Sequence, residues 1–165
     1  MSENIFFDKT LSKAEQYEML LPQIEELFKN DTNLIANLAN LMAVLKYSFN
    51  FFWVGVYFVE NEEELVLGPF QGPLACTRIQ KSRGVCGTAW EKAETIIVSD
   101  VEQFPGHIAC SSLSKSEIVV PVFNKKGSVF MIIDVDSEHL SFFDEDDKNG
   151  LERISILITD LLLKH

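Results

Sequence analysis

Apolar residues recur at helical spacing near both ends of the chain and at strand spacing between them. After the capping-box pattern SKAE at 12–15, apolar residues at every third or fourth position predict a first helix, in which Pro22 should cause a kink or a break. A second helix, capped by Asp31 or Thr32, should end near residue 47. Asp144 should open a final helix that ends near residue 164.

The centre of the chain, about 52–136, has the shorter apolar runs that are typical of strands. The expected strands are 52–59, 65–68, 76–79, 95–98, 117–123 and 128–136, with a helix inserted at about 84–91. The residues NKKG at 124–127 indicate a hairpin turn, and the aperiodic stretch 104–116 predicts a long loop.

This order of elements predicts an α+β fold with about six mostly antiparallel strands. The N- and C-terminal helices should cover one face of the sheet, and long loops should form a pocket on the other. A length of 165 residues corresponds to about one domain, so we expect residues 1–165 to form a single unit around one sheet.

The charge and hydropathy of the chain argue against two classes of partner, nucleic acid and membranes. The chain has 14 basic and 25 acidic residues, which gives a net charge of -11, and such a surface repels nucleic acid and anionic membranes. The first residues lack the pattern of a signal peptide, and the apolar runs are too short to span a bilayer. We therefore expect a cytoplasmic protein that binds neither nucleic acid nor membrane.

Three cysteines lie between residues 76 and 110, and an odd number does not suit a secreted disulfide framework. Cys110 lies in the aperiodic segment, where His107 and Lys115 could favour its thiolate. Spacing alone leaves an inert buried thiol and a redox or nucleophilic role both open. Zinc is disfavoured, because no C-x-x-C pair is present and a structural site needs four ligands.

A second group of candidate residues is acidic. Asp134 and Asp136 are two positions apart in an expected strand, so both side chains leave the same face, and Glu117 begins the preceding strand of the same hairpin. Acids at strand ends are often simply solvated. A carboxylate cluster on the pocket face would instead bind an ammonium group, or would raise the pKa of one carboxyl towards use as a general acid.

Trp53 and Tyr57 lie four positions apart on the same face of another expected strand. Two aromatic residues at this spacing are usually part of the core. The alternative is a binding surface for a methyl or thioether group.

Taken together, these motifs resemble the free methionine-(R)-sulfoxide reductases, which are single-domain enzymes with the GAF fold. The matching segments are GPFQG at 68–72, AC at 75–76, RGVCGTA at 83–89, GHIAC at 106–110, SEIVVP at 116–121 and DVDS at 134–137. The residues WVGVY at 53–57 match the aromatic strand that precedes them in the family. Each motif is weak alone, but six in the family's order are very specific.

The resemblance implies a thiol mechanism without metal or organic cofactor. Cys110 would attack the sulfoxide sulfur, release methionine and become a sulfenic acid. Cys76 would then form the Cys76–Cys110 disulfide, with Cys86 as an accessory or alternative resolving thiol, and thioredoxin would restore the dithiol. Relatives also suggest a homodimer.

The same resemblance places the substrate pocket at Trp53, Tyr57, Glu117, Asp134 and Asp136. Acids that pair with a free α-ammonium would reject methionine sulfoxide within a polypeptide, because that residue brings no cation to the buried charges. Residues 73–74 depart from the family pattern, in which a shorter or basic link precedes the Ala-Cys pair.

The main rival function is that of a GAF-type sensor, which binds a small ligand without chemistry. A sensor would not need Cys76 and Cys110 together. A zinc-dependent hydrolase is a third alternative, and it lacks enough ligands in the sequence.

Overall fold

The computed structural model describes residues 5–107 and 111–163. In chain order its elements are α1 (Lys13–Asn30), α2 (Leu34–Phe49), β1 (Trp53–Val59), β2 (Glu64–Gln71), β3 (Arg78–Gln80), α3 (Gly84–Lys92), β4 (Ile96–Val98), the 3-10 helix η1 (Val101–Gln103), β5 (Ser116–Phe123), β6 (Val129–Ser137) and α4 (Glu145–Leu161).

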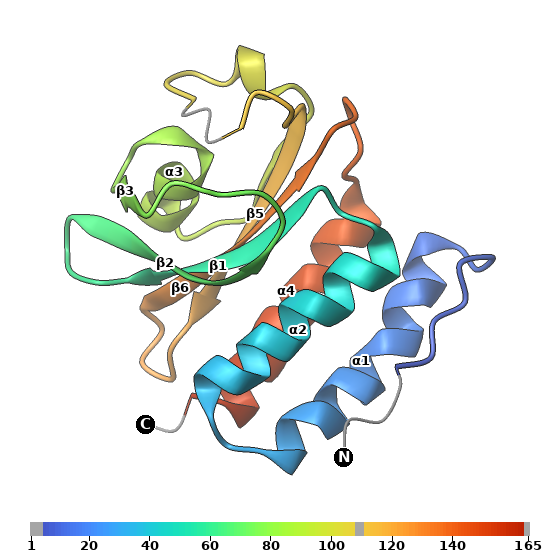
Figure 1. Cartoon of the computed structure of the whole chain (residues 1–165). Helices are drawn as coiled ribbons and strands as arrows, with labels where there is room; N and C mark the ends of the chain where they lie inside the picture. Colours follow the sequence, from blue (N-terminus) through green and yellow to red (C-terminus); the bar gives the residue numbers. More distant parts are fainter. Residues whose placement is uncertain (1–4, 108–110, 164–165) are drawn as a thin grey trace.

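The six strands form one sheet in the order β3-β2-β1-β6-β5-β4, and every neighbouring pair is antiparallel. Helices α1, α2 and α4 lie on one side of this sheet, and α3 lies on the other side with the connections around it (Figure 1). The predicted α+β class and the division of the two faces are therefore confirmed, and α3 covers part of the pocket face together with the loops.

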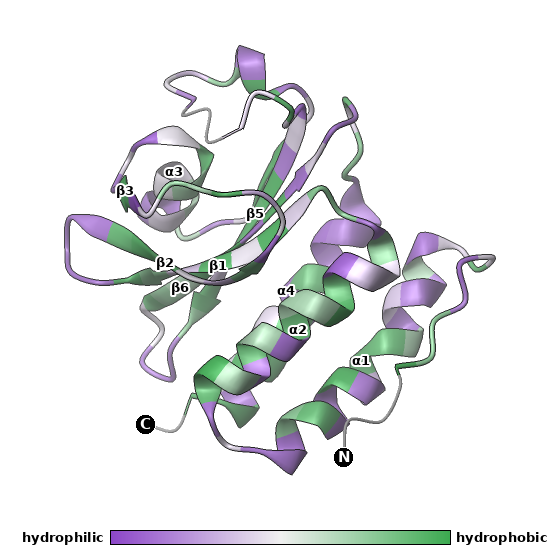
Figure 2. Ribbon diagram, in the orientation of Figure 1, coloured by the Kyte–Doolittle hydropathy of each residue, from purple (hydrophilic) through white to green (hydrophobic). Residues whose placement is uncertain are grey.

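Successive side chains of each strand point to opposite faces of the sheet, so they belong to two separate apolar clusters. On the helix side, Val54 and Val56 of β1 and Ile133 and Val135 of β6 are fully buried against the helices. Their neighbours in sequence face the other way and form a smaller cluster with α3. Hydrophobic residues follow the strands, whereas the turn between β1 and β2 is hydrophilic (Figure 2).

Of the kink or break expected at Pro22, the break is wrong, since α1 continues through this residue. Pro22 lies on the exposed side of α1, so water can solvate the carbonyl that its missing N–H leaves unpaired. The buried neighbours Leu21 and Ile24 keep the rest of the helix packed on the core. The expected capping box at Ser12 and Glu15 is confirmed.

The expected cap of the second helix is also wrong. Asn33 is the N-cap of α2, and its side chain accepts a hydrogen bond from the backbone N–H of Ala36 at 3.0 Å. Asp31 instead accepts from the N–H of Asn33 itself at 2.7 Å. Asp31, Thr32 and Asn33 are all good capping residues, and the sequence does not tell which of them enters the first turn.

Helix α1 lies against α4 at a close crossing. A Cβ atom at Gly150 of α4 would lie 2.2 Å from the ring of Tyr17, so only glycine leaves room for this ring. The Tyr17 hydroxyl donates to the buried carboxylate of Asp147 at 3.1 Å, and Lys13 forms an ion pair with the same carboxylate. This polar contact fixes the register of the two helices. It lies on the side of the sheet opposite α3.

None of the helices in the described part of the chain is both long and apolar enough to cross a membrane.

Candidate active site

Three predicted site residues form one row across the sheet. In the strand ladders, Asp136 of β6 pairs with Trp53 of β1 on one side and with Glu117 of β5 on the other. Paired residues on adjacent antiparallel strands have Cβ atoms about 5 Å apart, so backbone hydrogen bonding fixes their spacing. The sheet thus brings together residues that are up to 83 positions apart in sequence, from Trp53 to Asp136 (136 minus 53).

Asp134 lies two residues along β6 from Asp136 and adds a second carboxylate to the same face. Its nearest polar neighbours are Glu117 and Cys86, and one potential ligand atom of each of the three lies within 4.8 Å of the others. Asp134 is only 6% exposed, and its Oδ1 atom has no hydrogen-bond partner among residues 5–107 and 111–163. A buried carboxylate oxygen that accepts no hydrogen bond from the protein requires a donor from a ligand, or the carboxyl group must itself carry a proton.

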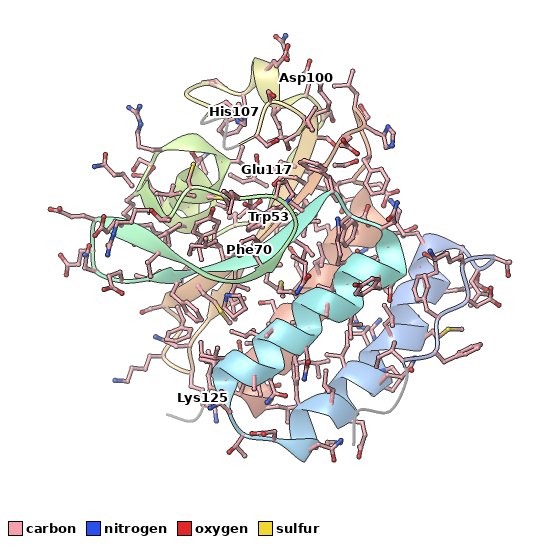
Figure 3. All side chains as sticks on the ribbon, viewed as in Figure 1. Trp53, Phe70, Asp100, His107, Glu117 and Lys125 are labelled. Carbon is pink, nitrogen blue, oxygen red and sulfur yellow. The ribbon has the colours of Figure 1, made fainter. Side chains whose placement is uncertain are left out.

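Two aromatic stacking contacts define the apolar side of the site. The Trp53 ring stacks with Phe70 of β2 at a centroid distance of 5.4 Å and with Tyr57 at 6.0 Å. Gly55 lies between the two β1 aromatics, and a Cβ atom there would lie 2.3 Å from the Trp53 ring. Figure 3 shows Trp53 and Phe70 over the sheet, with Glu117 beyond them and His107 on the loop.

The same two β1 aromatics also hydrogen-bond the segment that leads to β3. The Trp53 indole N–H donates to the carbonyl oxygen of Pro73 at 3.1 Å, and the Tyr57 hydroxyl donates to the carbonyl oxygen of Cys76 at 3.0 Å. Their rings therefore face the pocket while their polar atoms contact its wall.

A cavity of about 580 Å³, counted out to its open mouth, lies over these residues. Its lining contains all five predicted substrate-binding residues: Trp53, Tyr57, Glu117, Asp134 and Asp136. It also contains residues from α3 and the loops: Arg83, Cys86, His107 and Ser114.

Burial raises the pKa of all three carboxyl groups, and repulsion between negative charges adds to the shifts of two of them. Burial is the larger cause for Glu117 and Asp134, and the negative charges of the neighbouring aspartates raise both pKa values further. Desolvation raises the pKa of Asp136 to about 6, although a hydrogen bond from Ser114 opposes the shift. The site therefore retains protons at a pH where ordinary carboxyl groups have lost them.

The cavity mouth carries a positive group from α3. Arg83 is the N-cap of this helix, its side chain makes no capping hydrogen bond, and the first helical turn contains no acid. Arg83 is exposed, and it forms no ion pair within the described chain. Because the first N–H groups of a helix have no intrahelical acceptor, Arg83 and this turn together favour an anion.

The described cysteines differ in environment. Cys86 carries a buried free thiol that donates to Glu117 Oε1 at 3.7 Å, and burial with the adjacent carboxylates raises its pKa well above the ordinary value. Cys76 is half-buried and packs against the smaller apolar cluster, on the α3 side of the sheet. Cys110, the predicted attacking cysteine, lies outside the described residues.

The two groups expected to favour the Cys110 thiolate are both described. Lys115 pairs with Glu102, their charged atoms 3.3 Å apart. His107 lines the cavity, and burial lowers its pKa, which favours the neutral ring. Its Nδ1 atom is buried and has no hydrogen-bond partner in the described parts of the chain.

Cys86, Glu117 and Asp134 could also hold a divalent cation, because a thiolate and two carboxylates are three suitable zinc ligands. No sequence pattern indicates this trio, because its members come from α3, β5 and β6. The same negative group can bind an organic ammonium ion instead.

Sequence reasoning missed two residues that line the cavity, Arg83 and Ser114, and one residue that stacks on its wall, Phe70. Phe70 belongs to a motif but carries no chemical signal, and only its stack on Trp53 reveals its role. Ser114 lies in the aperiodic segment, where nothing indicates its contact with Asp136. Arg83 could have been found from its position before a helix entered through glycine.

Comparison with known proteins gives a consistent result. The GAF domain family model matches residues 29–162. "GAF domain-containing protein A" of Dictyostelium discoideum is 61% identical over 96% of this chain and 99% of its own length. The "Free methionine-R-sulfoxide reductase" of Saccharomyces cerevisiae is 40% identical over 95% of this chain and 91% of its own.

A solved structure agrees with these sequence relatives. The free methionine-R-sulfoxide reductase of Neisseria meningitidis, in complex with its substrate, superposes with a TM-score of 0.91. It is 52% identical, and the match covers 94% of this chain and 93% of that one.

Proposed function

Because the chain belongs to the free methionine-R-sulfoxide reductases, a family with the GAF fold, we propose that it reduces free methionine-(R)-sulfoxide to methionine through cysteine thiols. The observation that carries this proposal is the group of buried carboxyl groups, Glu117, Asp134 and Asp136, beside an aromatic surface in one cavity. A free amino acid with a thioether-like side chain complements both parts.

The charged ends of the substrate find opposite partners. The α-ammonium supplies hydrogen-bond donors that Asp134 Oδ1 lacks in the described structure, and it compensates the negative charge of the group. The α-carboxylate binds at Arg83 and the first turn of α3, one helical turn from Cys86. A sulfoxide within a polypeptide has neither charge and should be rejected.

The remaining atoms of the substrate are the methyl group and the sulfoxide. The methyl group packs on Trp53 and Tyr57, whose stacked rings form the apolar wall. The sulfoxide oxygen must gain a proton while its sulfur is attacked, and a carboxyl group with a raised pKa can donate that proton. Asp136, with a pKa of about 6, and Glu117 are suitable donors.

The reaction proceeds in two thiol steps. The Cys110 thiolate attacks the sulfur, takes up the oxygen as a sulfenic acid and releases methionine, so the substrate gains two electrons. The Cys76 thiol then attacks the sulfenic sulfur, which releases water and forms the Cys76–Cys110 disulfide. Thioredoxin reduces this disulfide by exchange, as expected for a protein of the reducing cytoplasm.

Cys86 suits a different task. A buried thiol whose pKa is raised stays protonated and is a poor nucleophile, but it remains a hydrogen-bond donor to Glu117. We therefore assign the resolving step to Cys76 first.

A thioredoxin-coupled assay with the R and S epimers supplied separately tests the proposal. Wild-type protein should consume the R epimer only, and Cys110→Ser should lose this turnover. A peptide that contains methionine sulfoxide serves as the second substrate and should not react. Equal turnover of the peptide would refute the recognition by charge, and undiminished turnover by Cys110→Ser would refute the assigned nucleophile.

A further inference from the structure

We propose that Cys86, Glu117 and Asp134 form an inhibitory zinc site, in which the ion takes the place of the substrate ammonium. The binding of zinc stands on the geometry of the three side chains, and only its inhibitory effect rests on the proposed reductase function. One potential ligand atom of each residue lies within 4.8 Å of the other two. The three ligands are thus already gathered before an ion binds.

The spacing of the sulfur and one oxygen fits a single tetrahedral ion. Zinc binds a thiolate at about 2.3 Å and a carboxylate oxygen at about 2.0–2.2 Å, so two such ligands of one ion lie about 3.5–3.7 Å apart. The Cys86 Sγ and Glu117 Oε1 atoms are 3.7 Å apart. The ligand oxygen of Asp134 needs to approach them by no more than about 1.5 Å to complete the set.

Asp134 offers an oxygen atom that the protein does not use. The residue is 6% exposed and lines the cavity, and its Oδ1 atom accepts no hydrogen bond within residues 5–107 and 111–163. A metal ion satisfies such an oxygen as a hydrogen-bond donor does, and its double charge compensates buried negative charge. The ion is therefore an alternative to the substrate ammonium at this oxygen.

The three ligands are held by separate elements of the fold. Cys86 lies in the first turn of α3, and Glu117 and Asp134 lie on the neighbouring strands β5 and β6. All three residues are buried, with exposed fractions of 5%, 6% and 6%. Because packing and the strand ladder already hold them, an ion that binds has little side-chain freedom to remove.

The ligand set favours zinc over the common hard cations. Mg²⁺ and Ca²⁺ take oxygen ligands, whereas a thiolate suits zinc. When zinc binds, the Cys86 thiol releases its proton to solvent, and the ion replaces the hydrogen bond to Glu117. Three protein ligands leave a fourth position for water, and the cavity that all three residues line can hold it.

Zinc and substrate compete for the same carboxylates. In the proposed reaction, Asp134 pairs with the substrate ammonium and Glu117 is one of the suitable proton donors. A carboxylate that binds zinc can neither pair with the ammonium nor carry the proton. The bound ion therefore opposes the thiol reaction and does not assist it.

A protein with a single thiol tests the ligands directly. The chain has three cysteines, so the double variant Cys76→Ser, Cys110→Ser keeps only Cys86. The reduced, chelator-treated protein is titrated with Co²⁺, and the ultraviolet charge-transfer band of a cobalt–thiolate bond is followed. We expect this band, one ion per chain and displacement of Co²⁺ by zinc. Mg²⁺ at the same concentrations should not displace it.

Two further substitutions in this double variant remove one ligand each. Adding Cys86→Ser should abolish the band and weaken zinc binding at least about ten-fold, since even changes around a metal ligand cost this much. Adding Glu117→Gln should keep the band of the Cys86 thiolate and weaken zinc binding at least about ten-fold. Asp160→Asn, which removes an exposed carboxylate, is the matched control and should leave the zinc affinity unchanged.

Free methionine, the product, tests whether zinc occupies the position of the substrate ammonium. A nitrilotriacetate buffer fixes the concentration of free zinc, so methionine cannot act by removing the ion from solution. Methionine at about ten times its own dissociation constant should weaken the apparent zinc affinity of the double variant about ten-fold. In reduced wild-type protein, zinc should slow methionine release, and excess sulfoxide should restore the rate.

The outcomes separate the zinc site from the proposed function. Absence of the cobalt–thiolate band in the double variant, or an unchanged zinc affinity after Cys86→Ser or Glu117→Gln is added, would overturn the site. Zinc binding that methionine does not weaken, or a methionine release that zinc leaves unchanged or accelerates, would overturn the inhibitory role. If zinc-free wild-type protein released no methionine, the reductase function would fail while the zinc site stood.

Discussion

The two faces of the central sheet are made by alternate residues of the same strands, yet they differ in chemistry. On the face under α1, α2 and α4, residues such as Val56, Ile133 and Val135 are fully buried among apolar side chains. On the other face, Asp134 and Glu117 are almost as deeply buried but carry ionisable groups. Burial on the first face stabilises the fold, whereas burial on the second raises the free energy of its charged groups.

Residues that stabilise the fold and residues that carry chemistry are therefore separated by the side of a strand and not by regions of sequence. The side chain of Asp134 can contact a ligand because Ile133 and Val135, which face the helices, hold the strand in place. Substitutions on the two faces should therefore change different measured quantities.

The largest effect is expected from the helix face. Ile154 of α4 is fully buried there, and Ile154→Ala should lower the free energy of unfolding by about 3–4 kcal/mol through lost burial and a cavity. Denaturant unfolding measures this change. The turnover per folded molecule should stay near the wild-type value, and Ile156→Ala, at an exposed position of the same helix, should change stability by less than about 0.5 kcal/mol.

The next effect belongs to the pocket face. Asp134→Asn should lower kcat/KM for free methionine-(R)-sulfoxide by about 100-fold, because the substrate ammonium loses a buried charged partner. The free energy of unfolding should stay equal or rise, since a repelling carboxylate is removed. Steady-state kinetics and denaturant unfolding of the same sample decide this, with Asp160→Asn on the exposed surface as the control. A stability loss as large as that of Ile154→Ala would abolish the distinction between the faces.

The burial of charge on the pocket face should also make the free energy of unfolding depend on pH. The pKa of Asp136 is about 6 in the folded protein and 3.8 for the ordinary carboxyl group, so the folded state binds the proton more tightly. The stability from this group is complete below about pH 4 and is lost as the pH rises to about 6. Asp136→Asn should therefore reduce the fall in stability over this interval by about 1–2 kcal/mol, after allowance for solvent screening.

Chemical unfolding at several pH values checks that prediction. Asp8 lies in an exposed turn, where hydrogen bonds from Thr10 lower its pKa. Asp8→Asn should therefore not reduce the fall in the free energy of unfolding between about pH 4 and 6. An unchanged pH profile of stability in Asp136→Asn would contradict the raised pKa of Asp136.

The smallest effect is expected from metal removal. Cys86, Glu117 and Asp134 could hold a cation, but the proposed thiol chemistry needs none. Dialysis against a chelator should change turnover by less than about two-fold, within the error of comparable assays. A loss that added zinc restores would show that the trio is a metal centre and would require a different mechanism.

The sequence predicted much of the fold because its periodicity is strong. Strands such as β5 and β6 and the hairpin turn between them follow from alternating apolar residues and the residues NKKG. Local errors arose where several residues satisfy the same rule. Asp31 and Asn33 can both cap a helix, and the break at Pro22 depended on which side of the helix faced the solvent.

The candidate site was predicted in part. The row formed by Trp53, Asp136 and Glu117 requires strand order, which no local pattern contains. The family resemblance supplied these residues, and the structure brings them to one cavity. The carbonyl contacts of Trp53 and Tyr57 could not be predicted, because a loop backbone carries no sequence signal for its acceptors. The assignment of Cys110 and a homodimer stay predictions.

The row across β1, β6 and β5 also has an evolutionary consequence. Its side chains are spaced by the hydrogen-bonded backbone and not by mutual packing, so one of them can be exchanged without displacing the next. Selection for a new small molecule could then act on alternate positions of three strands while the intervening residues keep the scaffold folded. A sheet of this kind can acquire binding sites for different small molecules with little loss of stability.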